Sequence, residues 1–369
     1  MFAPLFLSAA MITAQPLANE DFIEPSILNE VDHAVNRAPA DASFGSPLDL
    51  LAAICKLKRR TDETMTECAL RLVSSQRSDG RWTDAETNDV TAAAVCVLRQ
   101  LREDPVPPLR LSIFAHHIEE GARQAGIPFA EAAKRVKAMG YEGVDVSDEI
   151  SSDHLATLKA AGFEVACVAW MTRFDLGYDE SAAERVVRMA ETNRCPRVLC
   201  VPCWETGAIA PTNAALRAEI IARTERFACF AKTRGITVMV EDFDAPHAPT
   251  KDLANLTDFL EKAPSVMFAL DTGNFAPAGE QPTPAFHKFA GRIRHFHLKD
   301  RDPFNPNVSV AVGSGSVARV DWLGFLSMPR FWFYDGWYTV EHFGVADYLT
   351  CAEASAKFVK SILMSARTL

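Results

Sequence analysis

The segment RIRHFHLKD (292–300) decides the fold of this chain, because it is one of four short runs that end at a polar residue. The other three runs are ITVMVEDF (236–243), VMFALDTGN (266–274) and WYTVEHF (337–343). All four are rich in Val, Ile, Phe and Thr, the residues that favour strands. Gaps of roughly 25 to 45 residues separate their polar ends, enough for one helix and two loops. This spacing predicts βα units and a parallel sheet.

Four further strand-like runs come earlier in the chain. They are RLSIFAHH from Arg110, GVDVSD from Gly143, FEVACVAWM from Phe163 and PRVLCVPCW from Pro196. Amphipathic stretches between the runs predict helices, for example 127–140, with a proline early and a glycine just past the end. The eight units fill about residues 109–369, close to the roughly 250 residues of a (β/α)8 barrel. A G-x-G-x-x-G turn after the first strand, typical of doubly wound folds, is absent. The fold class is therefore α/β, as a (β/α)8 TIM barrel.

The polar ends of the last four runs predict a metal site. In such a barrel, residues at the carboxyl ends of neighbouring strands converge on one point. The residues concerned are Glu241, Asp271, His297 and Glu341. Three carboxylates and one imidazole favour one divalent ion, Mn, Mg or Co, and leave Zn or Fe open. Alternation along the strand also places His295, His297 and Lys299 together on the barrel side.

Several motifs in residues 109–369 resemble those of one family. They are AMGYEGVDV (138–146), DTGN (271–274), HFHLKD (295–300), VGSGSVARVDW (312–322) and TVEHF (339–343). The chain resembles the sugar phosphate isomerase/epimerase family of xylose isomerase-like TIM barrels. The resemblance implies that Glu241, Asp271, His297 and Glu341 bind a single divalent metal ion.

The chemistry that suits such a site is proton transfer beside a carbonyl. A bound metal would polarise the carbonyl, while Glu241 and Glu341 remove and return a proton through an enediolate. We therefore expect a metal-dependent isomerase or epimerase of a sugar, keto-polyol or related carbonyl compound. Two alternatives stay open: a metal-dependent dehydratase or lyase on the same scaffold, and a non-catalytic binding barrel. A single buried carboxylate at a strand end would suggest a structural charge, but four such residues in register do not.

Further residues are weaker candidates for catalysis or substrate binding. Lys299 could bind a substrate oxygen or phosphate, or form a salt bridge with Asp300 or Glu341. His247 is predicted to contact substrate from a loop, with a surface position as the alternative. Asn274 stands where many relatives carry a histidine, which leaves the substrate undetermined. The remaining substrate candidates are His116, or His117 beside it, and Trp170, Trp204 and Arg301. Ordinary packing is the alternative for the two tryptophans, and a surface ion pair is the alternative for Arg301.

The N-terminal third differs from the barrel. Residues 1–19 are apolar, like a weak signal sequence or a disordered stretch, and 20–105 show helical spacing. The pattern QRSDGRW (76–82) resembles the QW repeat of the α/α toroids of terpene cyclases and prenyltransferases. We expect a small all-α region before a barrel at 106–369. This region is a candidate for contact with a partner or a second copy of the chain.

Charge and cysteine content restrict the function further. The net charge of −10 argues against a nucleic-acid partner. An endonuclease IV-type site would also need histidines that this chain lacks, for example at Asn274. The nine cysteines, an odd number, suggest buried thiols in a reducing, cytoplasmic compartment. No run is long enough for a membrane span. The expected partner is a small sugar-like molecule, as the proposed carbonyl chemistry requires.

Overall fold

The computed structural model describes residues 75–78, 81, 109–203, 213–289, 292–315 and 336–367. The predicted apolar segment 1–19 lies outside these residues. So does the helical region 20–105, apart from 75–78 and 81, where the Arg77 amide donates to the Arg81 carbonyl at 2.9 Å. The predicted domain boundary at residue 106 also falls outside them. The architecture that follows is that of the barrel alone.

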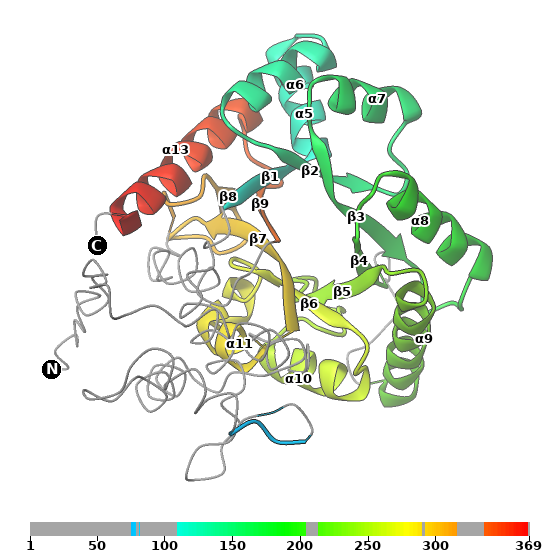
Figure 1. The fold of residues 1–369 in the computed structure, drawn as a ribbon. Coiled ribbons are helices and arrows are strands. Elements are labelled where there is room, and N and C mark those ends of the chain that lie inside the picture. The colour runs from blue at the N-terminus through cyan, green and yellow to red at the C-terminus, as the bar shows by residue number, and fades with distance from the viewer. Residues whose placement is uncertain are drawn as a thin grey trace, which may run out of the picture. The chain divides into compact units, whose positions relative to one another are not determined.

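Eight parallel strands form a closed barrel, as predicted (Figure 1). They are β1 (Arg110–Phe114), β2 (Gly143–Ser147), β3 (Glu164–Thr172), β4 (Arg197–Pro202), β5 (Thr237–Glu241), β6 (Met267–Asp271), β7 (Ile293–Arg301) and β9 (Trp337–Glu341). Neighbours in sequence pair with each other, and the ring closes where β9 pairs with both β7 and β1. All eight strands therefore end at one face of the barrel, where the candidate ligands lie.

Helices surround this ring of strands (Figure 1). They are α5 (Ala115–Ala125), α6 (Phe129–Ala138), α7 (Ser152–Ala160), α8 (Glu180–Thr192), α9 (Ala214–Lys232), α10 (Leu253–Lys262), α11 (Pro282–Phe289) and α13 (Tyr348–Arg367). Side chains of Ser151, Asp179, Asn213 and Asp252 accept N-terminal backbone amides and fix where four of them begin. Within the described part of the chain, no helix is both long and apolar enough to cross a membrane.

Two details differ from the sequence prediction. The first strand ends at Phe114, and the predicted strand residues Ala115 to His117 instead begin α5. The apolar pattern continues into the helix without a break, which conceals the boundary. The second detail is β8 (Ser309–Val310), which pairs antiparallel with the end of β7. A strand of two residues is too short to show alternation in the sequence.

The barrel interior has an apolar side and a polar side. The apolar side is a cluster of Cys167, Ala169, Leu199, Val201, Met239 and Ala269, from β3 to β6. The polar side includes Ser112, Asp145, His295 and Thr339, from β1, β2, β7 and β9. Between β6 and β7 the register shifts by one residue, because Phe268 pairs with Ile293 whereas Ala269 pairs with His295. Arg294 is thus an extra residue, a β-bulge that sets the face of every β7 residue after it.

The start of β2 packs closely against β9, and this contact yields a prediction. A Cβ added at Gly143 would lie 2.7 Å from a ring carbon of Trp337. We expect Gly143→Ala to lower the free energy of unfolding by about 1–3 kcal/mol in urea denaturation, because the ring must shift. Adding Trp337→Phe removes the clashing atoms, so the double variant should lose less than the two single losses combined. An unchanged urea midpoint for Gly143→Ala would contradict this packing.

Candidate metal centre

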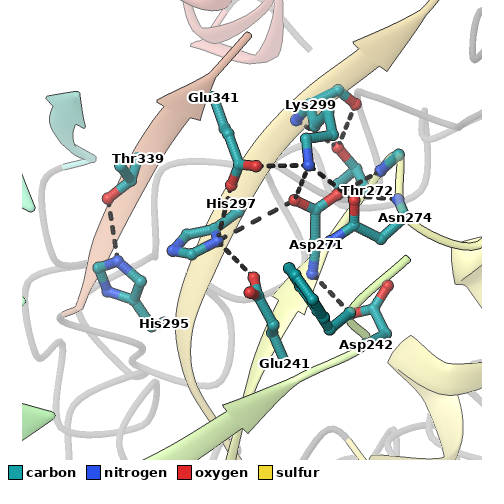
Figure 2. A network of polar contacts seen from close by, with 12 residues as sticks. Glu241, Asp242, Asp271, Thr272, Asn274, His295, His297, Lys299, Thr339 and Glu341 are labelled. Atoms are coloured by element: carbon teal, nitrogen blue, oxygen red, sulfur yellow. Dashed lines mark hydrogen bonds and ion pairs between the residues drawn. The ribbon is translucent and has the colours of Figure 1, made fainter. Parts of the chain in front are cut away.

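The four predicted ligands meet at the carboxyl ends of their strands (Figure 2). One donor atom from each of Glu241, Asp271, His297 and Glu341 lies within 4.8 Å of the others, and all four side chains are buried. The Nδ1 atom of His297 is 3.0 Å from Glu241 Oε2, 3.0 Å from Glu341 Oε2 and 4.0 Å from Asp271 Oδ2. The imidazole thus stands among three carboxylates that come from three different strands.

Lys299 adds a buried positive charge to this cluster. Its ammonium forms an ion pair with Glu341 and lies 3.5 Å from Asp271 Oδ2. Burial alone would raise the pKa of Glu341, but Lys299 and His297 lower it below its usual range. Burial also acts to lower the pKa of Lys299, whereas Asp271 and Glu341 raise it. Both groups are therefore charged at neutral pH, and the salt bridge predicted as an alternative for Lys299 is present.

Two other groups of the cluster have shifted pKa values. Burial raises the pKa of Asp271 to about 7, against the opposing effect of Lys299. For His297, burial would lower the pKa, but Asp145, Glu241 and Glu341 raise it well above its usual value. These raised pKa values favour the protonated forms of both groups. A metal ion would favour the deprotonated forms instead, because a cation competes with the proton for the same lone pairs.

The residues present fit a divalent metal ion. The Oδ2 atom of Asp271 is buried and accepts no hydrogen bond, and burying such an oxygen without a partner is costly. Its partner oxygen Oδ1 accepts the amides of Gly273 and Asn274 at 2.6 and 3.0 Å, which fixes the carboxylate. When His297 is neutral and Asp271 ionised, three carboxylates and one ammonium leave two negative charges, which a divalent cation would neutralise. The donor set of oxygen and imidazole nitrogen suits Mn, Mg or Co.

A second acidic group, missed in the sequence, lies next to this cluster. Asp145, Cys167 and His295 also place their donor atoms within 4.8 Å of one another. The Asp145 carboxylate already accepts from His295 at 2.8 Å and from Thr339 at 3.0 Å, which argues for a structural network rather than a second metal. A charged residue in the middle of the GVDVSD strand was the signal that could have revealed it.

Two of the predicted substrate residues lie directly beside the cluster. Asn274 is buried, and its Oδ1 accepts from Lys299 Nζ at 2.7 Å and from Arg301 at 3.1 Å. Arg301 is also buried rather than at the surface, and it forms its ion pair with Asp244, not with its neighbours Asp300 or Asp302. Asn274 thus links the two cations at the edge of the candidate site.

The histidine candidates lie on the same face of the barrel. His247 is half-buried in the loop between β5 and α10, and its Nε2 is buried without a hydrogen bond. His116 is exposed in the first turn of α5, and its ring stacks on Phe343, with centroids 5.3 Å apart. His117 is buried instead and accepts the amide of His342 at 3.0 Å. Of the adjacent pair, His116 is thus the histidine open to solvent.

The tryptophan candidates give a different result. Trp170 packs edge-on against Phe227 of α9, with centroids 4.7 Å apart. Of its neighbours, Ala169 belongs to the interior cluster and Met171 packs against that cluster, so alternation turns Trp170 toward the helices. Trp170 thus has the packing contacts that the sequence analysis gave as the alternative to a substrate contact. Trp204 lies outside the described residues.

Two carboxylates that the sequence did not single out support the site. Asp242 is buried and accepts the backbone amide of Asp271 at 2.9 Å, which holds the end of β6 in place. Asp300 accepts the amides of Gly313 and Gly315 at 2.9 and 3.0 Å. An added Cβ at Gly315 would clash with the Arg301 carbonyl, so the glycine permits the close approach of this loop.

Solved structures share this fold at low sequence identity. The probable 3-DHS dehydratase from Bacillus anthracis has a TM-score of 0.55 and 17% identity, over 68% of this chain and 99% of that one. The D-allulose 3-epimerase from Methylomonas sp., in complex with D-allulose, gives 0.53 and 15%, over 69% and 98%. A xylose isomerase-like TIM barrel protein from Mycobacterium smegmatis, in complex with magnesium, gives 0.52 and 17%, over 70% and 97%.

Two sequence comparisons, with curated proteins and with family profiles, gave different outcomes. No curated protein matches this chain. The profile described as Xylose isomerase-like TIM barrel matches residues 122–362, which is more than half of the chain and includes all four candidate ligands. With the closed parallel barrel, this match shows that the chain belongs to the xylose isomerase-like TIM barrel family.

Proposed function

We propose that this protein is a divalent-metal-dependent isomerase or epimerase of a sugar, a keto-polyol or a related small carbonyl compound. One observation carries the proposal: Glu241, Asp271, His297 and Glu341 converge within 4.8 Å at the carboxyl end of the barrel. The solved epimerase and dehydratase structures share the fold, which makes enzymatic chemistry the natural use of such a cluster. A metal ion held by these four residues would stabilise negative charge that develops on a substrate carbonyl oxygen.

The chain's own residues can handle the proton. Glu241 and Glu341 project from β5 and β9 and contact His297 Nδ1 from separate strands, so the two carboxylates flank the cluster (Figure 2). Glu341 is ionised at neutral pH, because Lys299 and His297 outweigh the effect of its burial on its pKa. It can therefore accept a proton from a carbon beside the carbonyl, and Glu241 can return one to the opposite face.

Lys299 has a different role in this proposal. Its pKa is raised by Asp271 and Glu341 despite its burial, so it remains an ammonium and cannot serve as a base. A fixed ammonium near the reacting oxygen would stabilise negative charge there without reorganisation. The Oδ1 atom of Asn274 holds the ammonium at 2.7 Å and orients it toward the carboxylate cluster.

The test is deuterium incorporation during turnover. Protein reconstituted with Mn2+ is incubated in D2O with ketoses, inososes and dehydroshikimate-like acids, and EDTA-treated protein serves as the control. We expect a converted compound to gain deuterium at the carbon beside the carbonyl, because a carboxylate exchanges its proton with solvent. Isomerisation without label would indicate a hydride shift, and product that has lost water would indicate a dehydratase. A chain that binds no Mn2+ would contradict the proposal itself.

A further inference from the structure

A buried polar network lies beside the candidate metal centre, inside the barrel. It consists of Ser112 (β1), Asp145 (β2), His295 (β7) and Thr339 (β9), each at most 1% exposed. Ser112 Oγ and Thr339 Oγ1 are 2.6 Å apart, and Thr339 Oγ1 donates to Asp145 Oδ1 at 3.0 Å. His295 Nε2 lies 2.8 Å from Asp145 Oδ2 and 2.9 Å from Thr339 Oγ1, the second of which Figure 2 shows. We call these four residues the Asp145 network.

The direction of the hydrogen bonds in this network is fixed by its chemistry. An ionised carboxylate only accepts hydrogen bonds, so Thr339 must give its proton to Asp145 and then accept the proton of Ser112. His295 must likewise carry its proton on Nε2 to donate to the same carboxylate. Asp145 meets a hydroxyl at Oδ1 and an imidazole nitrogen at Oδ2, the donor partners that an ionised carboxylate requires. One carboxylate therefore sets the hydrogen positions of its neighbours.

The same carboxylate also faces the ring of His297. Asp145 Oδ2 lies 3.4 Å from His297 Nε2, whereas Nδ1 on the other side of the ring is 3.0 Å from both Glu241 and Glu341. The ring of Phe114 packs edge-on against the imidazole, with centroids 5.0 Å apart, and restricts its rotation. A histidine that binds a metal through Nδ1 must keep its proton on Nε2, and an acceptor at Nε2 secures this tautomer.

We infer that Asp145 is a positioning residue that keeps the proton of His297 on Nε2 and so presents the Nδ1 lone pair to a divalent cation. This inference rests on the proposed metal-dependent function. Ser112, Thr339 and His295 hold the Asp145 carboxylate in place, while Asp145 itself touches neither the substrate nor the ion. The polar half of the barrel interior thus supports the ligand that β7 provides.

Substitution of Asp145 by asparagine tests this role with little change of volume. Asp145 meets Thr339 at Oδ1 and both histidines at Oδ2. An amide has one acceptor oxygen and an NH2 group that only donates, so it cannot present an acceptor to Thr339 and to the two histidines at once. We expect Asp145→Asn to weaken Mn2+ binding about 10- to 100-fold in calorimetric titration of the metal-free protein. Thr339→Val, which loosens the carboxylate without removing it, should cause a smaller loss.

Thr224→Val is the matched control for a buried hydroxyl. Thr224 is fully buried in α9 and donates to the Ile220 carbonyl at 2.8 Å, away from the cluster. Its loss should lower stability but leave the Mn2+ affinity unchanged. If Thr224→Val weakens Mn2+ binding as much as Thr339→Val does, general destabilisation explains the result and the positioning role is overturned.

Nitrogen NMR of the unmodified protein with Mg2+ reads the tautomers directly and requires no variant to fold. We expect both His295 and His297 to carry their proton on Nε2. A protonated Nδ1 on His297 with Mg2+ bound, or wild-type Mn2+ affinity in Asp145→Asn, would overturn the role of Asp145 alone. If the unmodified protein binds neither ion, the proposed function fails together with this role. The tautomer of His295 would still report whether the Asp145 network has the hydrogen-bond order given above.

Discussion

We expect the unmodified chain to bind about one divalent ion by elemental analysis after dialysis, and an Asp271→Ala, His297→Ala double variant should lose it. Asp271 provides the buried Oδ2 that accepts no hydrogen bond, and His297 provides the nitrogen at the centre of the three carboxylates. Without both, the site retains two glutamates, and Lys299 pairs with one of them. A double variant with the metal content of the unmodified chain would show that the ligands are elsewhere.

Loss of the metal should also appear in thermal stability. A ligand that binds only the folded state stabilises it by mass action, about 2.7 kcal/mol at a free concentration 100 times the Kd. We expect EDTA to lower the melting temperature of the unmodified protein and to leave that of the double variant unchanged. Asp300→Asn is the matched control, because Asp300 is a buried carboxylate of β7 that accepts loop amides. This variant should still respond to EDTA.

Glu241→Gln and Glu341→Gln should each lower kcat at least about 10²- to 10⁴-fold on the compound identified by the deuterium experiment. Each change removes a proton acceptor and a negative ligand while keeping the shape of the side chain. Glu341→Gln also leaves the ammonium of Lys299 without its carboxylate partner. Rates measured at saturating Mn2+ separate the loss of the base from weaker metal binding.

A glutamate outside the site provides the comparison for these two variants. Glu280 accepts the backbone amide of Leu253 at 2.8 Å, at the start of α10. Glu280→Gln keeps an acceptor oxygen at that position and should keep the full rate. An intact rate in either Glu241→Gln or Glu341→Gln would show that this residue is not an acid–base group.

The strands and the convergence of the four candidate ligands could be predicted from the sequence because both depend on local patterns. Each strand shows apolar residues with a polar residue at its end, and a closed parallel barrel brings those ends together without knowledge of individual contacts. This is why Glu241, Asp271, His297 and Glu341 were found although they lie far apart in sequence. The alternation of side chains along a strand also predicted that His295 and Lys299 face the barrel interior, and both are buried.

The remaining features depend on contacts that the sequence does not encode locally. For Trp170, near a strand end, the sequence left substrate contact and packing open, and in the structure its ring packs against Phe227 of α9. Asp145 escaped notice because its partners, His295 and Thr339, lie 150 and 194 residues later in the chain. Arg301, at the end of β7, forms an ion pair with Asp244 in the loop after β5, rather than with the aspartates on either side of it. Side-chain partners of this kind follow from how the barrel closes.

The bulge at Arg294 divides β7 into two parts that should differ in their tolerance of length changes during evolution. A deletion of Arg294 would leave Ala269 opposite His295, so every inward side chain after it would keep its place. A deletion of Phe296 would instead turn His297 and Lys299 toward the helices in one step. Homologues that gained or lost one residue before His295 could therefore retain the site, whereas those that did so between His295 and Lys299 could not.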